Sequence, residues 1–108
     1  MLKDENRLRR AADFDALYKR STTAGNRKFL IRFRGGAKKF GIVVSKKHGN
    51  AVKRNLIKRR IRAILEELMP NIKDFTVIII PKVGVLDLTY KELRKNLIHV
   101  LKQGKLLK

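Results

Sequence analysis

The residues best suited to chemistry lie in the stretch GNAVKRNLIKRRIR, residues 49–62, which holds six Lys or Arg side chains and no acid. Such side chains donate hydrogen bonds to phosphate oxygens, and Arg does so through two parallel bonds. The stretch is also predicted to begin a helix, with Asn50 as the N-cap residue. A helix N-terminus offers free N–H groups and a positive dipole, which both favour an anion. The stretch therefore predicts a phosphate-binding site.

The cations of this predicted helix are arranged in rows. At 100° per residue, Arg54, Lys58 and Arg62 form one i, i+4 row, and Asn55 and Arg59 form the neighbouring row. Each exposed positive charge at the start of a helix destabilises the helix by up to about 0.3–1 kcal/mol, because the dipole is already positive there. A missing anion explains this arrangement, while a solvated basic face of a core helix is the alternative. The remaining cations, on the other flank, are Lys53 and Arg60.

The sequence contains no convincing active site of its own. His48 and His99 lie far apart in the sequence without evident carboxylate partners, so His48 is expected in a loop or on phosphate and His99 at the surface. Glu66 and Glu67 are adjacent on a helix and point in different directions, which makes a poor metal pair. There is no Cys, no P-loop and no Cys/His ligand spacing. No catalytic residue and no metal ligand is therefore predicted.

The overall charge points to the same class of partner. The chain has 108 residues, with 28 Lys and Arg against 9 Asp and Glu, for a net charge of +19. So cationic a domain repels itself unless a polyanion neutralises it, and nucleic acid is the first candidate. A basic soluble protein and a membrane-surface protein are the alternatives. The longest apolar run, residues 77–80, is too short to cross a membrane, and the charged first ten residues are not expected to act as a secretory signal.

Three helices are expected from the apolar spacing. The first spans residues 11–20, with Phe14, Leu17 and Tyr18 on one stripe. The second spans 51–69 and ends before Pro70. The third spans 89–103, where Thr89 and Glu92 form a capping box. The apolar faces of the second and third helices are predicted to be Ile57, Ile61, Ile64, Leu65 and Leu68, and Leu93, Leu97, Val100 and Leu101.

Strands are expected between the helices. Residues 28–34 alternate, so that Phe29, Ile31 and Phe33 face a core while Leu30, Arg32 and Arg34 take the other face. GGAK then supplies a turn, and residues 39–45 are predicted to form the hairpin partner. Residues 75–81, FTVIIIP, are predicted to form a buried strand. The order predicts a single domain over residues 1–108, an α+β two-layer sandwich with one sheet.

Three segments resemble the protein component of bacterial ribonuclease P. The middle one, VVSKKHGNAVKRNLIKRRIR, resembles the basic signature of that family, NRLRRAADFDALYKR resembles its first helix, and DLTYKELRKNL its last. The resemblance implies a single mixed sheet with an unusual left-handed β-α-β crossover, against the general right-handed rule. It further implies a cytoplasmic subunit that joins a large catalytic RNA and assists removal of the 5′ leader from precursor tRNA. The active site and its Mg²⁺ ions are then expected in the RNA.

The resemblance also assigns residues to roles. The catalytic RNA is expected to contact Lys53, Arg54, Asn55, Lys58, Arg59 and Arg62. One position departs, because the family has Arg-Asn-Arg where this chain has Arg54-Asn55-Leu56. A cleft for the single-stranded leader is expected from Phe14, Tyr18, Leu30 and Arg32, and further phosphate contacts from Ser45, Lys46, Lys47 and Lys82.

Two alternatives remain open at this level. Phe14 and Tyr18 fit plain core packing of a short amphipathic helix as well as a cleft. A general RNA-binding or ribosomal protein would share the charge and the fold, and it would bind RNA without stimulating leader cleavage. A membrane-active basic protein is disfavoured by the predicted strands. No protein partner is predicted.

Overall fold

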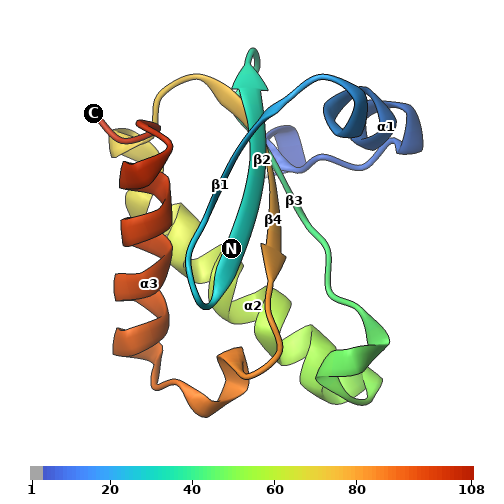
Figure 1. Cartoon of the computed structure of the whole chain (residues 1–108), viewed down its shortest axis with the longest axis vertical. Coiled ribbons are helices and arrows are strands. Elements are labelled where there is room, and N and C mark those ends of the chain that lie inside the picture. Colours follow the sequence, from blue (N-terminus) through green and yellow to red (C-terminus); the bar gives the residue numbers. More distant parts are fainter. Residues whose placement is uncertain (1–3) are drawn as a thin grey trace.

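The computed structural model describes residues 4–108, which form one four-stranded sheet and three α-helices joined by short 3₁₀ turns (Figure 1). The helices are α1 (Ala11–Lys19), α2 (Ala51–Leu68) and α3 (Tyr90–Gln103). The strands are β1 (Thr22–Gly25), β2 (Phe29–Gly35), β3 (Lys39–Ile42) and β4 (Phe75–Pro81). The bounds of the three helices agree with the predicted ones to within one residue, which confirms the apolar spacing as the signal.

The local signals that begin and end the helices also hold. The Asn50 side chain accepts a hydrogen bond of 3.0 Å from the Lys53 N–H at the start of α2. At the start of α3, Glu92 N–H donates to Thr89 Oγ1 at 3.1 Å and Thr89 N–H donates to Glu92 Oε1 at 2.9 Å, so the capping box is complete. These bonds satisfy N–H groups that have no partner inside the helix. Gly104 follows the last residue of α3 as its C-cap.

The predicted hairpin between residues 28–34 and 39–45 is wrong. The strand order is β1-β2-β4-β3, so β4 lies between the two strands that were expected to pair. β4 is antiparallel to β2 over seven residue pairs and parallel to β3. The physical reason is burial, because the apolar β4 needs cover on both faces and edges, and a central position provides it.

The hairpin partner of β2 is instead β1, a short strand that its sequence TTAG did not suggest. Asn26 makes the turn, because its Oδ1 accepts hydrogen bonds from the N–H groups of Lys28 and Phe29 at 2.9 and 2.8 Å. A side chain that bonds backbone two and three residues ahead closes a tight turn in this way. β1 is therefore held by chemistry in the turn rather than by apolar alternation.

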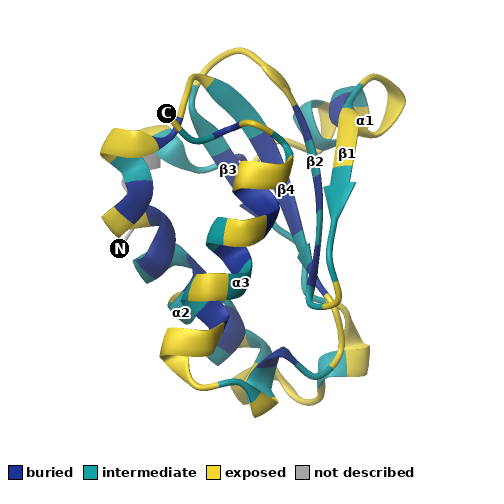
Figure 2. Cartoon of the chain, turned by 60° about the vertical axis from the view of Figure 1, so that its left-hand side comes forward, coloured by how far each residue is buried: buried dark blue, intermediate teal, exposed yellow. Residues whose placement is uncertain are grey.

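The two faces of the sheet are covered differently. α2 and α3 pack on one face, where they form the main core with Phe29, Ile31 and Phe33, as predicted. α1 packs on the opposite face, where Leu17 and Leu8 contact Ile78 of β4. Figure 2 shows α2 and α3 on one side of the strands and α1 on the other, with the buried residues between the layers. The expected α+β fold with a single mixed sheet is therefore observed.

The connection from β3 through α2 to β4 joins two parallel strands. Figures 1 and 2 show both strands running downwards while α2 returns on the face shared with α3, and this gives the crossover a left-handed sense. Most such connections are right-handed. The crossover places the N-terminus of α2, with its cationic stretch, beside the end of the sheet where β4 finishes. Within residues 4–108 no helix is long and apolar enough to cross a membrane.

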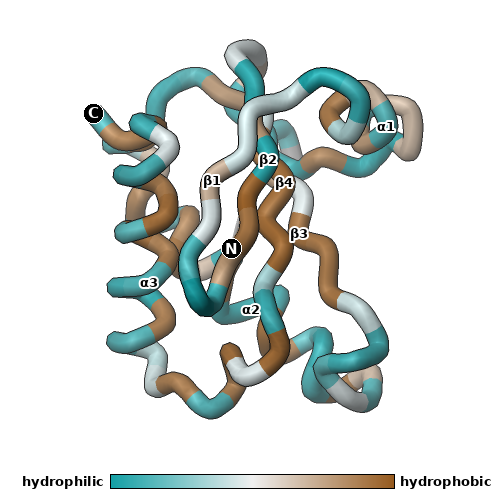
Figure 3. Tube along the Cα trace, in the orientation of Figure 1, coloured by the Kyte–Doolittle hydropathy of each residue, from teal (hydrophilic) through white to brown (hydrophobic). Residues whose placement is uncertain are grey.

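The hydropathy of the chain follows this layering. Figure 3 shows hydrophobic residues along β2 and β4 and on the side of α3 that faces the sheet, while the loop before α2 is hydrophilic. The buried side chains of α2 and α3 are the nine predicted ones, and all lie in the main core. The cations of these helices are therefore left on the outside of the molecule.

Candidate RNA interface

The cationic row of α2 lies on a rigid helix whose apolar side is fully buried. Arg54, Lys58 and Arg62 are half-buried along its flank, while Asn55 and Arg59 are exposed. The first turn of the helix holds no acid, and the Nε atom of Arg54 is buried without a hydrogen-bond partner among the described residues. Buried polar groups usually have a partner, so the unbonded Nε of Arg54 is an exception within the described part of the fold. The row predicted from the sequence is thus formed as a surface.

The loop before α2 extends the cationic surface. Ser45, Lys46 and Lys47 are all exposed at or beside a 3₁₀ turn, next to Lys53 in the first turn of the helix. His48 anchors this loop, because its Nε2 lies 3.0 Å from the carbonyl oxygen of Pro81 at the end of β4. A carbonyl only accepts, so Nε2 is the protonated nitrogen there. His48 therefore anchors the loop, whereas the sequence had left open whether it is a loop residue or a phosphate contact.

The far end of the row meets the N-terminal segment. Leu8 N–H donates to the Phe40 carbonyl at 2.9 Å, which fixes the extended segment on β3 with Leu8 in the small core. Arg7 and Arg9 then face away from that core. Together with Arg62 and Phe14 they line a hollow of about 150 Å³. Burial, followed by the charges of Arg7 and Arg9, lowers the pKa of Arg62 from its ordinary value.

Arg7 and Arg9 were missed by the sequence reasoning. The available signal was the alternation of Arg7, Leu8 and Arg9, which is typical of an extended segment with one buried side chain. The Nε atom of Arg7, like that of Arg54, is buried and lacks a hydrogen-bond partner in the described part of the chain. The gathering of like charges raises the electrostatic energy of the free protein and favours an anion at this hollow.

The second predicted site is the surface between α1 and the sheet. The guanidinium carbon of Arg32 lies 5.1 Å from the centroid of the Tyr18 ring, within the range of a cation–π contact. Tyr18 is 44% exposed although it is aromatic. Leu30 lies beside Arg32 on the same face of β2, half-buried, and pairs with Ile80 of β4, which is also half-buried. An exposed ring of α1 thus contacts a guanidinium of β2, and the half-buried Leu30 and Ile80 lie on the same face of the sheet as that guanidinium.

Phe14 has a different environment from Tyr18. A Cβ atom added at Gly41 would lie 2.5 Å from Cζ of Phe14, so the ring packs directly on the backbone of β3. Phe14 also packs against the small core of Leu8, Leu17 and Ile78. Phe14 is therefore half-buried and packed against the protein, while Tyr18 is the more exposed of the two rings. We call the surface of Tyr18, Leu30, Arg32 and Ile80 the α1 groove.

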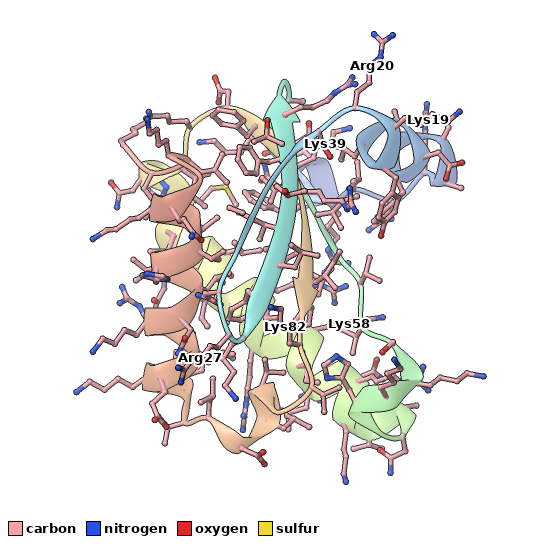
Figure 4. The ribbon with its side chains drawn as sticks, viewed as in Figure 1. Lys19, Arg20, Arg27, Lys39, Lys58 and Lys82 are labelled. Atoms are coloured by element: carbon pink, nitrogen blue, oxygen red, sulfur yellow. The ribbon has the colours of Figure 1, made fainter. Side chains whose placement is uncertain are left out.

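Lys82, one of the predicted phosphate contacts, already makes a hydrogen bond within the protein. It is exposed and follows β4, but its Nζ donates a hydrogen bond of 2.7 Å to the carbonyl oxygen of Asn26. Figure 4 shows Lys58 and Lys82 at a similar height, near the end of β4, while Lys19, Arg20 and Lys39 lie at the other end. Within residues 4–108, no group of three or more His, Asp or Glu side chains could hold a metal ion.

The arrangement can bind phosphate along α2 and an unpaired base in the α1 groove. Helix α1 and the far end of the α2 row meet at one hollow, which Phe14 and Arg62 both line. Leu56, which stands where the family has Arg, is half-buried on α2 next to the exposed Asn55. Its presence removes one cation from the surface without interrupting the row of Arg54, Lys58 and Arg62.

Comparison with known proteins shows which family the chain resembles. The sequence profile of the family Ribonuclease P matches residues 2–105. The ribonuclease P protein component of Streptococcus equi is 43% identical over 109 residues, covering 98% of this chain and 92% of that protein. Among solved structures, a Staphylococcus aureus RNase P protein, a mutant with defective mRNA degradation activity, has a TM-score of 0.89 at 35% identity, with 94% and 90% of the two chains covered. The Thermotoga maritima RNase P protein has a TM-score of 0.83 at 30% identity, with 90% and 96% covered.

Proposed function

The chain belongs to the ribonuclease P protein family, and from this premise we propose how its two surfaces serve the enzyme. It is a subunit of a ribonucleoprotein endoribonuclease that processes the 5′ end of tRNA, and it associates with the ribonuclease P RNA. We assign the row of α2 and the loop before it to the catalytic RNA, and the α1 groove to the single-stranded 5′ leader of precursor tRNA. On this proposal the protein acts in the cytoplasm.

The assignment of α2 to the catalytic RNA is supported by the charge of the row and the absence of acid from its first turn. Phosphate neutralises the charges that oppose the helix dipole, so binding removes a repulsion that the free protein carries. With about six phosphates bound, the affinity for RNA should fall by roughly 10³ between 50 and 200 mM salt.

The assignment of the α1 groove to the leader rests on the contact between Tyr18 and Arg32, which is the observation that carries the proposal. Every base has a flat face, so an exposed ring beside a guanidinium binds unpaired nucleotides without demanding a sequence. Leader sequences differ between tRNAs, and a sequence-tolerant surface suits them. A double-stranded RNA would not offer its base faces to this ring.

The chemistry of cleavage is proposed to belong to the RNA. The described part of the chain holds no cluster of metal ligands, and its role is affinity, positioning and charge neutralisation. Mg²⁺ would be held mainly by RNA phosphates, with the protein lowering the concentration needed by reducing phosphate repulsion.

The direct test is cleavage of a precursor tRNA by a bacterial ribonuclease P RNA at low Mg²⁺, with and without this protein. Strong stimulation with a single mature 5′ end is expected. Binding to the RNA without stimulation would instead support a general RNA-binding protein. A flat response of binding to salt would overturn the electrostatic part of the assignment.

A further inference from the structure

A second hollow, lined by polar and charged residues, lies between the β1–β2 turn and α3, on the face of the sheet opposite to α1. It has a volume of about 530 Å³. It is open along the solvent side of α3, and it plays no part in the sites described above. The residues that line it are Asn26, Arg27, Glu92, Lys95, Asn96 and His99.

The turn is fixed against α3 by one side chain. Asn26 Nδ2 donates a hydrogen bond of 3.0 Å to the Asn96 carbonyl oxygen and lies 3.2 Å from Nδ1 of His99. The Asn26 carbonyl oxygen accepts the Lys82 Nζ–H at 2.7 Å. Asn26 therefore joins the turn to the helix and to the end of β4, and Arg27, the next residue, is held beside α3.

The solvent face of α3 carries a row of Lys side chains. Lys91, Lys95 and Lys102 are exposed, and their spacing of four and seven residues puts them on one line opposite the buried stripe. Like charges four residues apart on a helix destabilise it by a few tenths of a kcal/mol. The pair Lys91 and Lys95 is thus unfavourable in the same way as the i, i+4 pairs of α2, whereas Lys102 lies in the last turn, where a cation suits the helix dipole. Stability of the free protein does not account for the first two charges.

The acids near this row are already engaged. Glu92 is the one acid of α3 in the sequence, and its Oε1 accepts the Thr89 N–H of the capping box. Glu67 of α2 lies at 2.8 Å from Arg94, on the flank of α3 away from the hollow. Arg27, Lys91, Lys95 and Lys102 consequently form a net cationic surface, which we call the α3 surface.

The α3 surface and the α1 groove cannot serve one short RNA segment. α1 packs on one face of the sheet, whereas α3 packs on the other through the main core. Figure 4 places Arg27 on the α3 side of the molecule and Lys58 of α2 on the other side of β4. An RNA segment on the α3 surface would be a separate one.

We propose that the α3 surface is a second RNA-binding surface, which contacts the phosphate backbone of an RNA segment separate from those at α2 and in the α1 groove. The proposal rests on the proposed function, since it takes the partner to be a large folded RNA complex. Lys and Arg side chains without an exposed large apolar neighbour in the hollow suit phosphates rather than an apolar protein face. The protein then bridges two RNA segments.

The first test measures the salt dependence of binding to the ribonuclease P RNA in complex with precursor tRNA. Replacing Lys91 and Lys95 together by Ala removes two charges and keeps good helix formers. The slope of log K against log salt should fall by about two, because each of these side chains is expected to neutralise one phosphate. The matched control replaces the exposed Lys73 and Lys108 by Ala and should leave the slope unchanged. Equal slopes for the two double variants would overturn the proposal.

The second test locates the RNA segment. The chain has no Cys, so a single Cys placed at Lys95, Lys58 or Lys73 can carry a tethered hydroxyl-radical probe. Cuts from position 95 are expected at nucleotides that the probe at position 58 does not cut. Labelling the ribonuclease P RNA and the precursor tRNA in separate experiments identifies which one supplies the segment. Cutting from position 95 no stronger than from position 73 would overturn the proposal.

The two levels of proposal can fail separately. If the unmodified protein does not stimulate leader cleavage, the proposed function fails. If it stimulates cleavage, but the Lys91 and Lys95 variant keeps the full salt slope, only the α3 surface fails.

Discussion

The guanidinium carbon of Arg32 lies 5.1 Å from the centre of the Tyr18 ring, although β2 and α1 are separated by a turn and by strand β1. The contact joins an exposed ring to the face of the sheet that also carries the half-buried Leu30 and Ile80. Tyr18 and Arg32 thus form one platform, a ring with a guanidinium beside it, on the surface of the protein.

The first prediction concerns this platform. Tyr18→Ala should weaken the preference for precursor over mature tRNA, because stacking of a base on an aromatic ring contributes about 1–3 kcal/mol, or roughly 5- to 150-fold. Binding constants for the two tRNAs in the assembled enzyme measure this. Tyr18→Phe keeps the ring and should keep the preference. Tyr18 is 44% exposed, so the fold should survive either change. Unchanged preference in Tyr18→Ala would contradict the leader assignment.

The second prediction tests whether α1 must lie where it does. Gly41→Ala places a Cβ atom 2.5 Å from Cζ of Phe14, and the ring must move. Overpacking of this kind costs about 1–3 kcal/mol, and the displaced α1 should lose leader preference while α2 still binds the catalytic RNA. Thermal unfolding and the two RNA affinities report the effects. Gly35→Ala is the control, because nothing lies within 4 Å of its added Cβ. Equal behaviour of the two variants would show that the contact between Phe14 and β3 is unimportant.

The third prediction concerns the row of α2. Arg54→Ala combined with Arg59→Ala should reduce the salt slope for binding to the catalytic RNA by about two and weaken assembly, since each phosphate left without its Arg lowers the slope by about one. The ratio of affinities for precursor and mature tRNA should not change, because the α1 groove is untouched. Titration of labelled RNA at several salt concentrations measures both. If the variant lost leader preference but kept the salt slope for binding to the catalytic RNA, the assignment of α2 to the catalytic RNA would be contradicted.

The fourth prediction is a pH dependence of stability. Hydrogen bonds from Thr89 lower the pKa of Glu92 below its ordinary value of 4.5. A carboxyl with a lowered pKa stabilises the fold above its unfolded pKa, and this contribution disappears as the pH falls through the folded pKa. The melting temperature of the protein should therefore exceed that of Glu92→Gln at neutral pH, and the difference should shrink below about pH 4.5. Gln can still form the capping box, so it is a close comparison.

A constant difference between these two proteins from neutral to acid pH would contradict the assignment of the shift to Glu92. Thr89→Ala removes the hydroxyl but keeps the backbone N–H that donates to Glu92 Oε1, so it should reduce the pH dependence that Glu92 contributes without abolishing it.

Much of the helical structure was determined by the sequence itself. The bounds of α2 and α3, their buried stripes and the caps at Asn50 and Thr89 all depend on residues no more than a few positions apart. Such signals can be read along the chain because a helix bonds each residue to its fourth neighbour. The cationic row of α2 and the alternation of β2 follow from the same short-range periods.

The order of the strands was decided only by the tertiary structure. β2 and β3 are neighbours in the sequence, but β4 enters between them because it is the most apolar strand. The pairing of β4 with β2 joins residues forty or more positions apart, and no local pattern encodes such a choice. The same limit concealed β1, which is held by the side chain of Asn26.

The candidate sites divide in the same way. Residue types and spacing predicted that α2 binds phosphate. Only the fold showed that Arg7 and Arg9 lie beside Arg62 of this helix, because the N-terminal segment pairs with β3. The sequence placed Phe14 and Tyr18 on one stripe of α1, and packing on Gly41 then left Phe14 half-buried while Tyr18 remained exposed. Charge is a property of composition, but the convergence of charges and rings depends on contacts between distant segments, which only the folded chain brings together.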